Sequence, residues 1–274
     1  MRSHASASDP PWSSTRVSDR AWCQLCPNSS PMTLDGTNTW IVTEPGAGES
    51  IVIDPGPLDE AHLSAVLSHV HSIGSRVALT LLTHHHADHA EAAGRFGQLT
   101  QAPVRAAGSG HDDLGEGDLV RVGGLELLVV ATPGHTGDSL SFLLPGEQRL
   151  FTGDTVLGRG TTVVAYPDGE LAAYLASLER LGRLTRSGEV TTLSPGHGPT
   201  MTDAAGVVEF YLAHRTERLD QVRQAVVELS ASSAQRSGDL ADAVVARVYA
   251  DVPSEVWPAA RLSVLAQLDY LRST

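Results

Sequence analysis

The chain has 274 residues, which gives room for about 1.5 to 2 domains at roughly 150 residues each and for a core that needs no disulfide or metal to hold it. Its 32 acidic residues outnumber its 19 basic residues, the formal net charge is −13, and every basic residue is arginine. The absence of lysine excludes Schiff-base chemistry at a lysine and a P-loop lysine. The acidic balance disfavours double-stranded DNA, because general affinity for polyanions comes from many phosphate-neutralising cations.

Cysteine content and hydropathy indicate a cytoplasmic protein. The two cysteines, Cys23 and Cys26, are too few for a secreted disulfide scaffold. A redox pair or half of a zinc knuckle is disfavoured, because no second Cys-x-x-Cys motif accompanies them. Residues 1–16 lack the apolar region of a signal peptide, and no stretch approaches the ~18 apolar residues of a membrane span. Neither secretion nor a membrane partner is expected.

The predicted elements change in character along the chain. Residues 1–20 are expected to form a disordered leader, because they cannot bury enough apolar surface to offset the entropy of ordering. Over 21–202, short apolar runs alternate with Gly, Pro, Asp and His, as strands bounded by turns do. The expected strands are 40–43, 50–53, 77–83, 125–131, 139–144, 149–151 and 190–193, and helical spacing predicts helices over 58–73 and 171–184.

The last part of the chain, residues 203–274, has a different texture. Ala, Leu, Val, Arg and Glu recur at helical spacing over 203–229 and 239–271, with Pro253 and Pro258 marking a break. We therefore expect a small helical C-terminal domain after an α/β domain over 21–202.

The strongest chemical signal is the segment Thr83-His84-His85-His86-Ala87-Asp88-His89, which directly follows an apolar strand. Neutral imidazole and carboxylate are ligands for Zn, Mn and Fe, and a loop that leaves a strand end lets alternate residues converge on one point. His85 is expected to face away by this alternation. The segment therefore predicts a metal site.

Three more expected strands end in a glycine-flanked histidine or aspartate. The segments are Thr132-Pro133-Gly134-His135-Thr136, Thr152-Gly153-Asp154-Thr155 and Ser194-Pro195-Gly196-His197-Gly198. Any one of them alone is typical of an ordinary turn. Together they indicate one site, because ligands in α/β folds gather at the carboxyl ends of strands.

The ordered pattern H-x-H-x-D-H, P-G-H-T, G-D and P-G-H-G resembles the metallo-β-lactamase superfamily over residues 33–200. The segments 33–40 and 153–162 are similar to the subgroup that contains β-lactamase-like protein 2, an endoribonuclease. The resemblance implies an αββα sandwich with a winged-helix-like C-terminal domain. It also implies two divalent metal ions, the first bound by His84, His86 and His135, the second by Asp88, His89 and His197, with Asp154 bridging both.

Hydrolysis is the expected reaction class. Two metal ions about 3.5 to 4 Å apart would lower the pKa of a water bound between them toward ~7 and so supply a bridging hydroxide at neutral pH. Zinc is the default metal, with Mn or Fe as alternatives. Asp88 is a candidate catalytic residue that orients the hydroxide or passes its proton to the leaving group. The alternative, that Asp88 only holds its metal, stays open.

Differences from relatives narrow the reaction. Antibiotic-degrading members of the commonest class carry cysteine where Asp154 stands, and flavin-linked di-iron members carry glutamate where His86 stands, so neither activity is expected. Cleavage of single-stranded RNA and hydrolysis of a small thioester or ester remain open, because the same metal chemistry serves both. A non-catalytic metal-binding scaffold is disfavoured, since structural sites are closed and rich in cysteine.

Substrate contacts are expected from two segments near the ligands. Asn38 and Arg159 are the candidates, with Arg159 recognising an anionic group, although Gly158 and Gly160 also fit a turn that leaves Arg159 in solvent. Arg215 and Arg218 lie three apart on one predicted helix face, for which a solvated face is the default and phosphate contact the alternative. A homodimer is compatible with the sequence.

Overall fold

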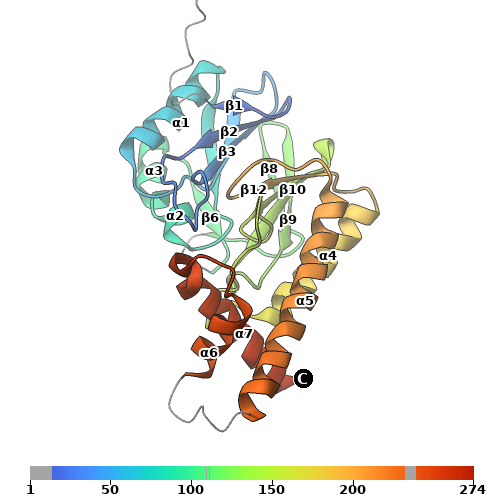
Figure 1. Ribbon diagram of the computed structural model, residues 1–274. Helices are drawn as coiled ribbons and strands as arrows, with labels where there is room; N and C mark the ends of the chain where they lie inside the picture. Colours follow the sequence, from blue (N-terminus) through green and yellow to red (C-terminus); the bar gives the residue numbers. More distant parts are fainter. Residues whose placement is uncertain (1–13, 109, 111, 232–238) are drawn as a thin grey trace, which may run out of the picture.

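The computed structural model describes residues 14–108, 110, 112–231 and 239–274, and Figure 1 shows their arrangement. Two β-sheets pack face to face. The strand order in the first sheet is β1 (Thr15–Arg16), β2 (Ala21–Leu25), β3 (Asn38–Thr43), β4 (Glu49–Ile53), β5 (Arg76–Leu81), β6 (Val104–Ala106) and β7 (Asp112–Asp113). The order in the second is β12 (Thr192–Pro195), β11 (Arg149–Gly153), β10 (Leu140–Leu144), β9 (Leu125–Ala131) and β8 (Leu119–Val122), with the short helix η1 (Pro145–Glu147) between β10 and β11.

Helices cover the outer faces of both sheets. The first sheet is covered by α1 (Glu60–Ser72) and α3 (Ala93–Thr100), and the short helix α2 (Ala87–Ala90) begins soon after β5. The second sheet is covered by α4 (Leu171–Arg186) and α5 (Ala204–Ala231), which lie side by side in Figure 1. No helix in the described ranges combines the length and apolar character needed to cross a lipid bilayer.

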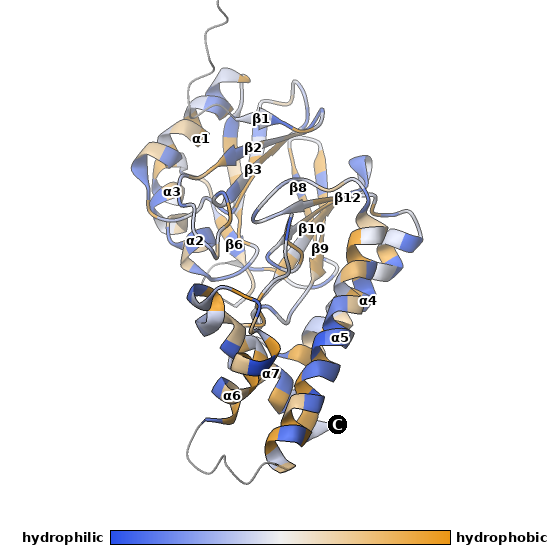
Figure 2. Cartoon of the chain, in the orientation of Figure 1, coloured by the Kyte–Doolittle hydropathy of each residue, from blue (hydrophilic) through white to orange (hydrophobic). Residues whose placement is uncertain are grey.

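Side-chain alternation along β3 explains why both faces of the first sheet are buried. Trp40 and Val42 point between the sheets, where they join the cluster that contains Phe142 of β10. Ile41 points the other way, into the cluster that contains Leu63 of α1. Successive side chains of a strand point to opposite faces, and Figure 2 shows the resulting hydrophobic residues along the strands of both sheets. The predicted αββα sandwich is confirmed.

The C-terminal helices have a core of their own. The helices α6 (Leu240–Val248) and α7 (Trp257–Ser273), with the short helix η2 (Ser254–Val256) before α7, pack on the second half of α5. The predicted break at Pro253 is confirmed, since this residue caps η2. Pro258 instead lies in the first turn of α7, where proline is tolerated because an N–H at that position would have no helical partner.

Helix α5 belongs to both parts of the molecule. It begins at Ala204, close to the boundary predicted at residue 203. Val208 and Tyr211 in its first half pack into the core beneath the second sheet, whereas Val222 in its second half packs with α6 and α7. The catalytic fold and the C-terminal domain therefore share one continuous helix.

The leader expected over residues 1–20 is wrong for its last part. Strand β1 pairs with β2 at the edge of the first sheet, and Arg20 forms an ion pair with Glu44 in which Nε lies 2.5 Å from Oε2. Pairing with a neighbouring strand satisfies the backbone of a segment with few apolar residues, which composition alone does not reveal. Residues 1–13 lie outside the described residues.

Candidate metal centre

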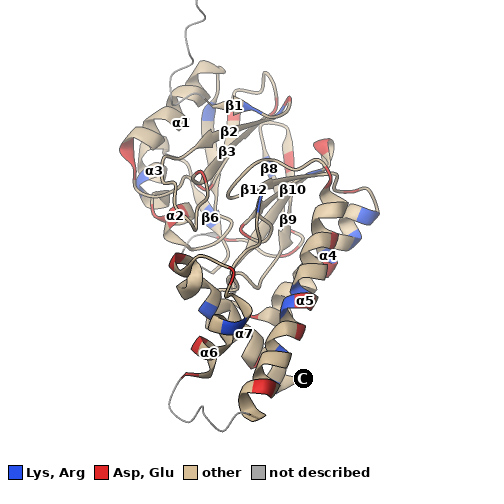
Figure 3. Ribbon diagram, viewed as in Figure 1, with Lys and Arg blue, Asp and Glu red and all other residues tan. Residues whose placement is uncertain are grey.

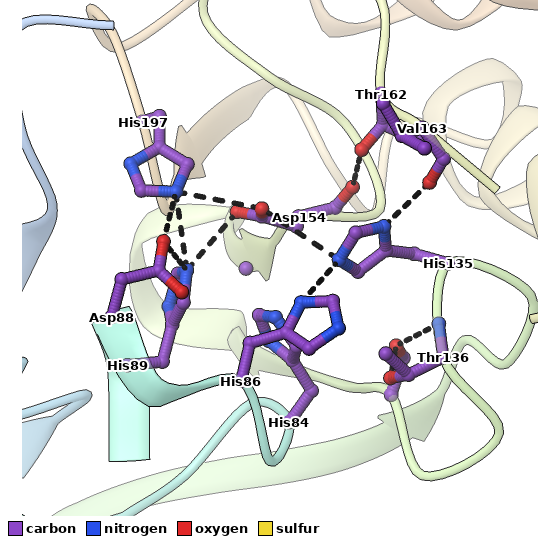
Figure 4. A network of polar contacts seen from close by, with 12 residues as sticks. His84, His86, Asp88, His89, His135, Thr136, Asp154, Thr162, Val163 and His197 are labelled. Carbon is purple, nitrogen blue, oxygen red and sulfur yellow. Dashed lines mark hydrogen bonds and ion pairs between the residues drawn. The ribbon is translucent and has the colours of Figure 1, made fainter. Parts of the chain in front are cut away.

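The fold brings the four predicted ligand segments to one edge of the molecule. One segment follows β5 and enters α2, and the others follow β9, β11 and β12. Because β10 is antiparallel to both β9 and β11, and β11 is parallel to β12, the carboxyl ends of β9, β11 and β12 share an edge. Figure 4 shows the side chains that meet there, which we call the ligand cluster: His84, His86, Asp88, His89, His135, Asp154 and His197.

The first group in the cluster contains three histidines, His84, His86 and His135, whose ring nitrogens lie within 4.8 Å of one another. Nδ1 of His135 donates to Val163 O at 2.6 Å. Its Nε2 therefore carries a lone pair, and it lies 3.0 Å from Nδ1 of His86. Nε2 of His84 is buried and has no hydrogen-bond partner among the described residues. A shared cation would satisfy this orphaned acceptor, whose burial is otherwise costly.

The second group contains Asp88, His89 and His197. Nδ1 of His89 donates to the Asp54 carboxylate at 2.9 Å, and Nδ1 of His197 donates to Gly36 O at 3.1 Å. The two Nε2 atoms lie 3.2 Å apart and 3.5 and 3.1 Å from Oδ2 of Asp88. Two Nε2 lone pairs this close repel each other unless a proton or a metal ion lies between them, so the geometry of this group also fits a cation.

Asp154 lies between the two groups. Its Oδ2 is 3.4 Å from Nε2 of His197 and 3.8 Å from Nε2 of His135. Its Oδ1 is 3.4 Å from Nε2 of His89 and is buried without a hydrogen bond to the described residues. A carboxylate in this place can contact a cation in either group, which is the position implied for a bridging ligand.

Ionisation differs between the two groups. Burial, followed by the neighbouring His89 and His135, lowers the pKa of His84 well below its usual range. Burial, followed by His135, lowers the pKa of His86 to about 4. The first group therefore offers neutral imidazoles, the form that binds metal.

The second group is surrounded by negative charge. Burial alone would lower the pKa of His197, but Asp154 and Asp88 outweigh it and raise this pKa to about 10. Burial alone would raise the pKa of Asp154, but His197 and His89 outweigh it and hold this pKa well below its usual range. When no metal ion is bound, a proton on His197 therefore supplies part of the positive charge that a cation would bring.

Asp54 is a further residue of the site that the sequence interpretation missed. It is 1% exposed, has a φ of 53°, and accepts hydrogen bonds from Thr83 N at 2.8 Å and Thr83 Oγ1 at 2.7 Å as well as from His89. A carboxylate on the outer nitrogen of a histidine ligand fixes its tautomer and ring orientation. In the sequence, Ile53-Asp54-Pro55-Gly56 is typical of an ordinary turn after a strand and gives no sign of a special role. In the structure, the φ above zero at a non-glycine residue sets Asp54 apart.

Gly196 allows the ligands to approach one another. A Cβ at this position would lie 2.5 Å from Oδ1 of Asp154 and 2.6 Å from Cε1 of His89. Only glycine leaves room for both side chains, which explains the glycine of the segment that carries His197.

Asn38, the other predicted substrate contact, uses its side-chain polar atoms within the protein. It is 4% exposed, and its amide nitrogen donates to Pro195 O at 3.0 Å and Gly198 O at 2.8 Å. Its Oδ1 accepts a hydrogen bond from Sγ of Cys23 at 3.2 Å. With these atoms engaged, Asn38 fastens the loop that carries His197.

Both cysteines are free thiols. Burial raises the pKa of Cys23 to about 12, and burial followed by Asp59 raises that of Cys26 to about 12. Neither thiol is ionised at neutral pH, and no cysteine belongs to a potential metal group in the described part of the chain.

Residues 157–163, which we call the cleft loop, connect the ligand cluster to α5. The backbone N–H of Leu157 donates to the hydroxyl of Tyr211 at 2.8 Å. Thr162 donates through Oγ1 to Asp154 O at 2.5 Å, and its own carbonyl accepts from Nη2 of Arg215. Because the loop also supplies the carbonyl that fixes His135, α5 helps to position this histidine through the loop.

Arg159 lies on the same cleft loop. Its Nη1 and Nη2 bind the two oxygens of Asp35 at 2.6 and 2.8 Å, and its side chain is 51% exposed. Arg159 also lines the cavity beside the ligand cluster. Its guanidinium is therefore more than a solvated turn residue, although an anionic substrate group would have to share it with Asp35.

The ligand cluster opens into a cavity of about 310 Å³, lined in part by His135 and Asp154. This volume is near the lower end of the range for small-molecule sites, about 300 to 1,000 Å³. The apolar lining comes from both parts of the molecule: Met32, Leu34, Leu157 and Val163, and from the C-terminal helices and their connections Val252, Val256, Ala259 and Ala260. His85 lies outside the cavity lining, with its Nδ1 2.9 Å from Oδ1 of Asp138 and its side chain 48% exposed, which agrees with its predicted orientation.

Comparison with known proteins identifies the family. The model of the metallo-β-lactamase superfamily matches residues 32–111 and 105–197, and that of the β-lactamase-associated winged-helix domain matches 241–273. A β-lactamase-like protein 2 homolog of Caenorhabditis elegans is 32% identical over 266 residues, covering 91% of this chain and 82% of the relative.

Two further matches agree with this result. The atrochrysone carboxyl ACP thioesterase of Aspergillus chevalieri is 32% identical over 250 residues, covering 88% of this chain and 77% of that protein. The structure of a metallo-β-lactamase family protein of Thermus thermophilus has the same fold, with a TM-score of 0.76, 22% identity, and coverage of 94% of this chain and 95% of that one. The chain belongs to the metallo-β-lactamase superfamily of hydrolases, as the ordered histidine and aspartate motifs indicated.

Proposed function

We propose that the chain hydrolyses a small thioester or ester. The cavity of about 310 Å³ beside the ligand cluster carries this proposal, because its lining suits one small molecule with an apolar portion. The similarity to a protein named as a thioesterase, over 88% of this chain, supports the same reaction class.

Cleavage of single-stranded RNA, the alternative drawn from the resemblance to β-lactamase-like protein 2, fits the described surface less well. A strand of RNA needs a groove whose cations follow its phosphates. The chain carries a formal net charge of −13, and Figure 3 shows basic and acidic residues interspersed along α5. Arg159, the expected anion contact, lines the cavity and also binds Asp35, and one such cation does not make a groove that follows a strand of phosphates.

The ligand assignment is part of the proposal. His84, His86 and His135 would hold one divalent cation, Asp88, His89 and His197 a second, and Asp154 would contact both. Zinc is the default, with Mn or Fe as alternatives, and such cations lower the pKa of a bound water and polarise the carbonyl under attack.

Asp88 is the proposed proton carrier. Its side chain is 29% exposed, compared with 10% for Asp154 and 1% for Asp54, so it is the most accessible carboxylate of these three. Burial alone would raise its pKa, but the hydrogen bond from His197 and the charge of His89 outweigh it and lower the pKa. Asp88 is therefore ionised, and it would accept the proton that the attacking water releases and deliver it to the leaving thiolate or alkoxide.

The test compares substrates with one metal-loaded preparation. We expect acyl thioesters to release thiol and single-stranded RNA of mixed sequence to remain intact. Strong RNA cleavage that is lost in Asp88→Ala would replace the thioester proposal. A fully loaded protein that turns over neither substrate would favour the scaffold alternative.

The ligand assignment has its own test. We expect His86→Ala and Asp154→Ala each to lower the metal content from near two ions per chain, measured by elemental analysis, and to abolish hydrolysis while the circular dichroism spectrum stays unchanged. His85→Ala is the matched control and should keep its metal, because its side chain points away from the cluster. Unchanged metal content in both cluster variants would refute the assignment.

A further inference from the structure

A second polar wall faces the cavity from α5. His214, Arg215 and Arg218 lie along one side of this helix, and all of them line the cavity that His135 and Asp154 also line. The sequence interpretation took the two arginines as solvated by default, with phosphate contact as the alternative. The structure corrects this default, since Arg215 is 6% exposed and Arg218 is partly buried.

Arg215 is a buried cation without a carboxylate partner among the described residues. Its Nη2 donates to Thr162 O, its Cζ lies 4.8 Å from the centre of the Tyr174 ring, and its Nε is buried with no hydrogen-bond partner in the described chain. Charged groups this deeply buried are almost always paired. The missing partner is therefore expected to be an anion that is not part of the described chain.

Arg218 is fixed in place but is also not paired with a carboxylate of the described residues. Its Nη1 donates to Val248 O at 3.0 Å and to Oε1 of Gln221 at 2.9 Å, and its Cζ lies 4.8 Å from the centre of the Tyr249 ring. Both hydrogen bonds use Nη1. An oxyanion in the cavity can therefore use another edge of the guanidinium, in the planar geometry that favours carboxylate and phosphate.

The pKa of His214 reflects the positive charge of this wall. Burial, followed by the positive charges of Arg215 and Arg218, lowers its pKa, and the charge of Glu217 only partly opposes this. Nδ1 of His214 is buried without a partner among the described residues. The same two cations that disfavour a charged His214 favour an anion beside it.

We propose that Arg215 and Arg218 bind one anionic group of the substrate, a carboxylate or a phosphate oxygen, while its ester bond lies at the ligand cluster. This inference rests on the proposed function for its reaction and names the substrate class more closely: a small thioester or ester that carries an oxyanion apart from the bond that is cleaved. Two cations suit one such group, whereas a polymer of phosphates needs many.

The kinetic test uses matched thioesters. Glutaryl-N-acetylcysteamine places a carboxylate on the acyl part, pentanoyl-CoA places phosphates on the thiol part, and pentanoyl-N-acetylcysteamine is the neutral reference. We expect one of the two anionic substrates to have a kcat/KM above that of the reference, which identifies the source of the oxyanion. Arg218→Gln should lower this kcat/KM by about 10-fold or more, mainly through KM, and lower that of the neutral reference much less.

The matched control is Arg223→Gln, because Arg223 lies on the same helix but is exposed and paired with Asp220. It should leave all three rates unchanged. If Arg218→Gln lowers all three rates equally, or lowers none, the anion site is overturned while the hydrolase proposal stands.

A binding measurement keeps the two proposals distinguishable. Calorimetric titration of the metal-loaded protein with glutarate and with glutaramide compares ligands of equal length with and without carboxylates. We expect Arg218→Gln to weaken the binding of glutarate by about 10-fold and to change the binding of glutaramide much less. This result supports the anion site even if no thioester is hydrolysed, in which case the proposed function fails. Equal affinities of wild type and variant for glutarate overturn the anion site.

Discussion

Histidine ligands in the cluster are oriented by groups on their outer nitrogens. Asp54 does this for His89 and also binds the backbone and hydroxyl of Thr83, directly before the first ligand, His84. Asp54 therefore contacts His89 of the second group and the residue that directly precedes His84 of the first group, although it belongs to neither group.

We expect Asp54→Asn to lower metal affinity by about 10-fold to 100-fold, because the amide cannot act as a charged acceptor for His89 and Thr83 together. Competition with a chromogenic chelator measures the affinity. Asp220→Asn, an exposed change on α5, is the control and should have no effect. An unchanged affinity in Asp54→Asn would contradict the orienting role.

Metal affinity should also depend on pH through His197. Its pKa of about 10 in the metal-free chain lies above the ordinary value of 6.5, so the group is protonated at neutral pH and must lose its proton when a cation binds. Below pH 10, raising the pH therefore strengthens metal binding, by about tenfold per pH unit for each proton released. Calorimetry in buffers of different ionisation enthalpy counts the protons, and zero released at pH 7 would refute this prediction.

The sequence revealed the residues of the ligand cluster better than the residues around them. The cluster residues follow strand ends in short segments rich in histidine, aspartate and glycine, and such local patterns are visible without a structure. The role of Asp54 depends on a contact with His89, 35 positions away, and that of Asn38 on contacts with the loop near His197, more than 150 positions away. Contacts of this kind leave no local signal, so Asp54 was missed and Asn38 was given a different role.

At the scale of elements, the connection between α5 and the cleft loop is the feature most open to test. Tyr211→Phe removes the acceptor for the buried N–H of Leu157. We expect a loss of about 1 to 3 kcal/mol in the free energy of unfolding, which for a chain of this size lowers the melting temperature by roughly 2 to 4 °C per kcal/mol.

Tyr270→Phe is the matched control for this change. Tyr270 packs against the same hydrophobic cluster, but its hydroxyl makes no hydrogen bond to the described residues. Equal melting temperatures for the two variants would show that the hydrogen bond to the cleft loop does not contribute to stability.

Elements with a strong pattern of their own were predicted well. The strand expected over 125–131 is β9 (Leu125–Ala131), and the helix expected over 171–184 is α4 (Leu171–Arg186). The strands β1, β2, β6, β7 and β8 were missed because they are short strands that are defined by their partners. Helix α3 was missed because it contains Gly94 and Gly97, which disfavour a helix by roughly 1 kcal/mol each relative to alanine.

At the scale of the whole molecule, the shared helix α5 makes the two parts interdependent. A chain that ends at residue 202 would lose Val208 and Tyr211 from the core beneath the second sheet and the partner of Thr162. We expect this fragment to lack a cooperative thermal transition and to bind less than the full complement of metal, whereas the full chain shows both. A fragment that melts cooperatively with undiminished metal content would contradict this expectation.

The cavity is lined by residues from both the αββα sandwich and the C-terminal domain. Its reactive end is formed by strand termini, whereas Val252, Val256, Ala259 and Ala260 come from helices and turns of the C-terminal domain. Substitutions at these four positions can therefore change the shape of the cavity without altering the strand ends that carry the ligand cluster. A protein engineer who wants a new specificity should randomise these four positions first.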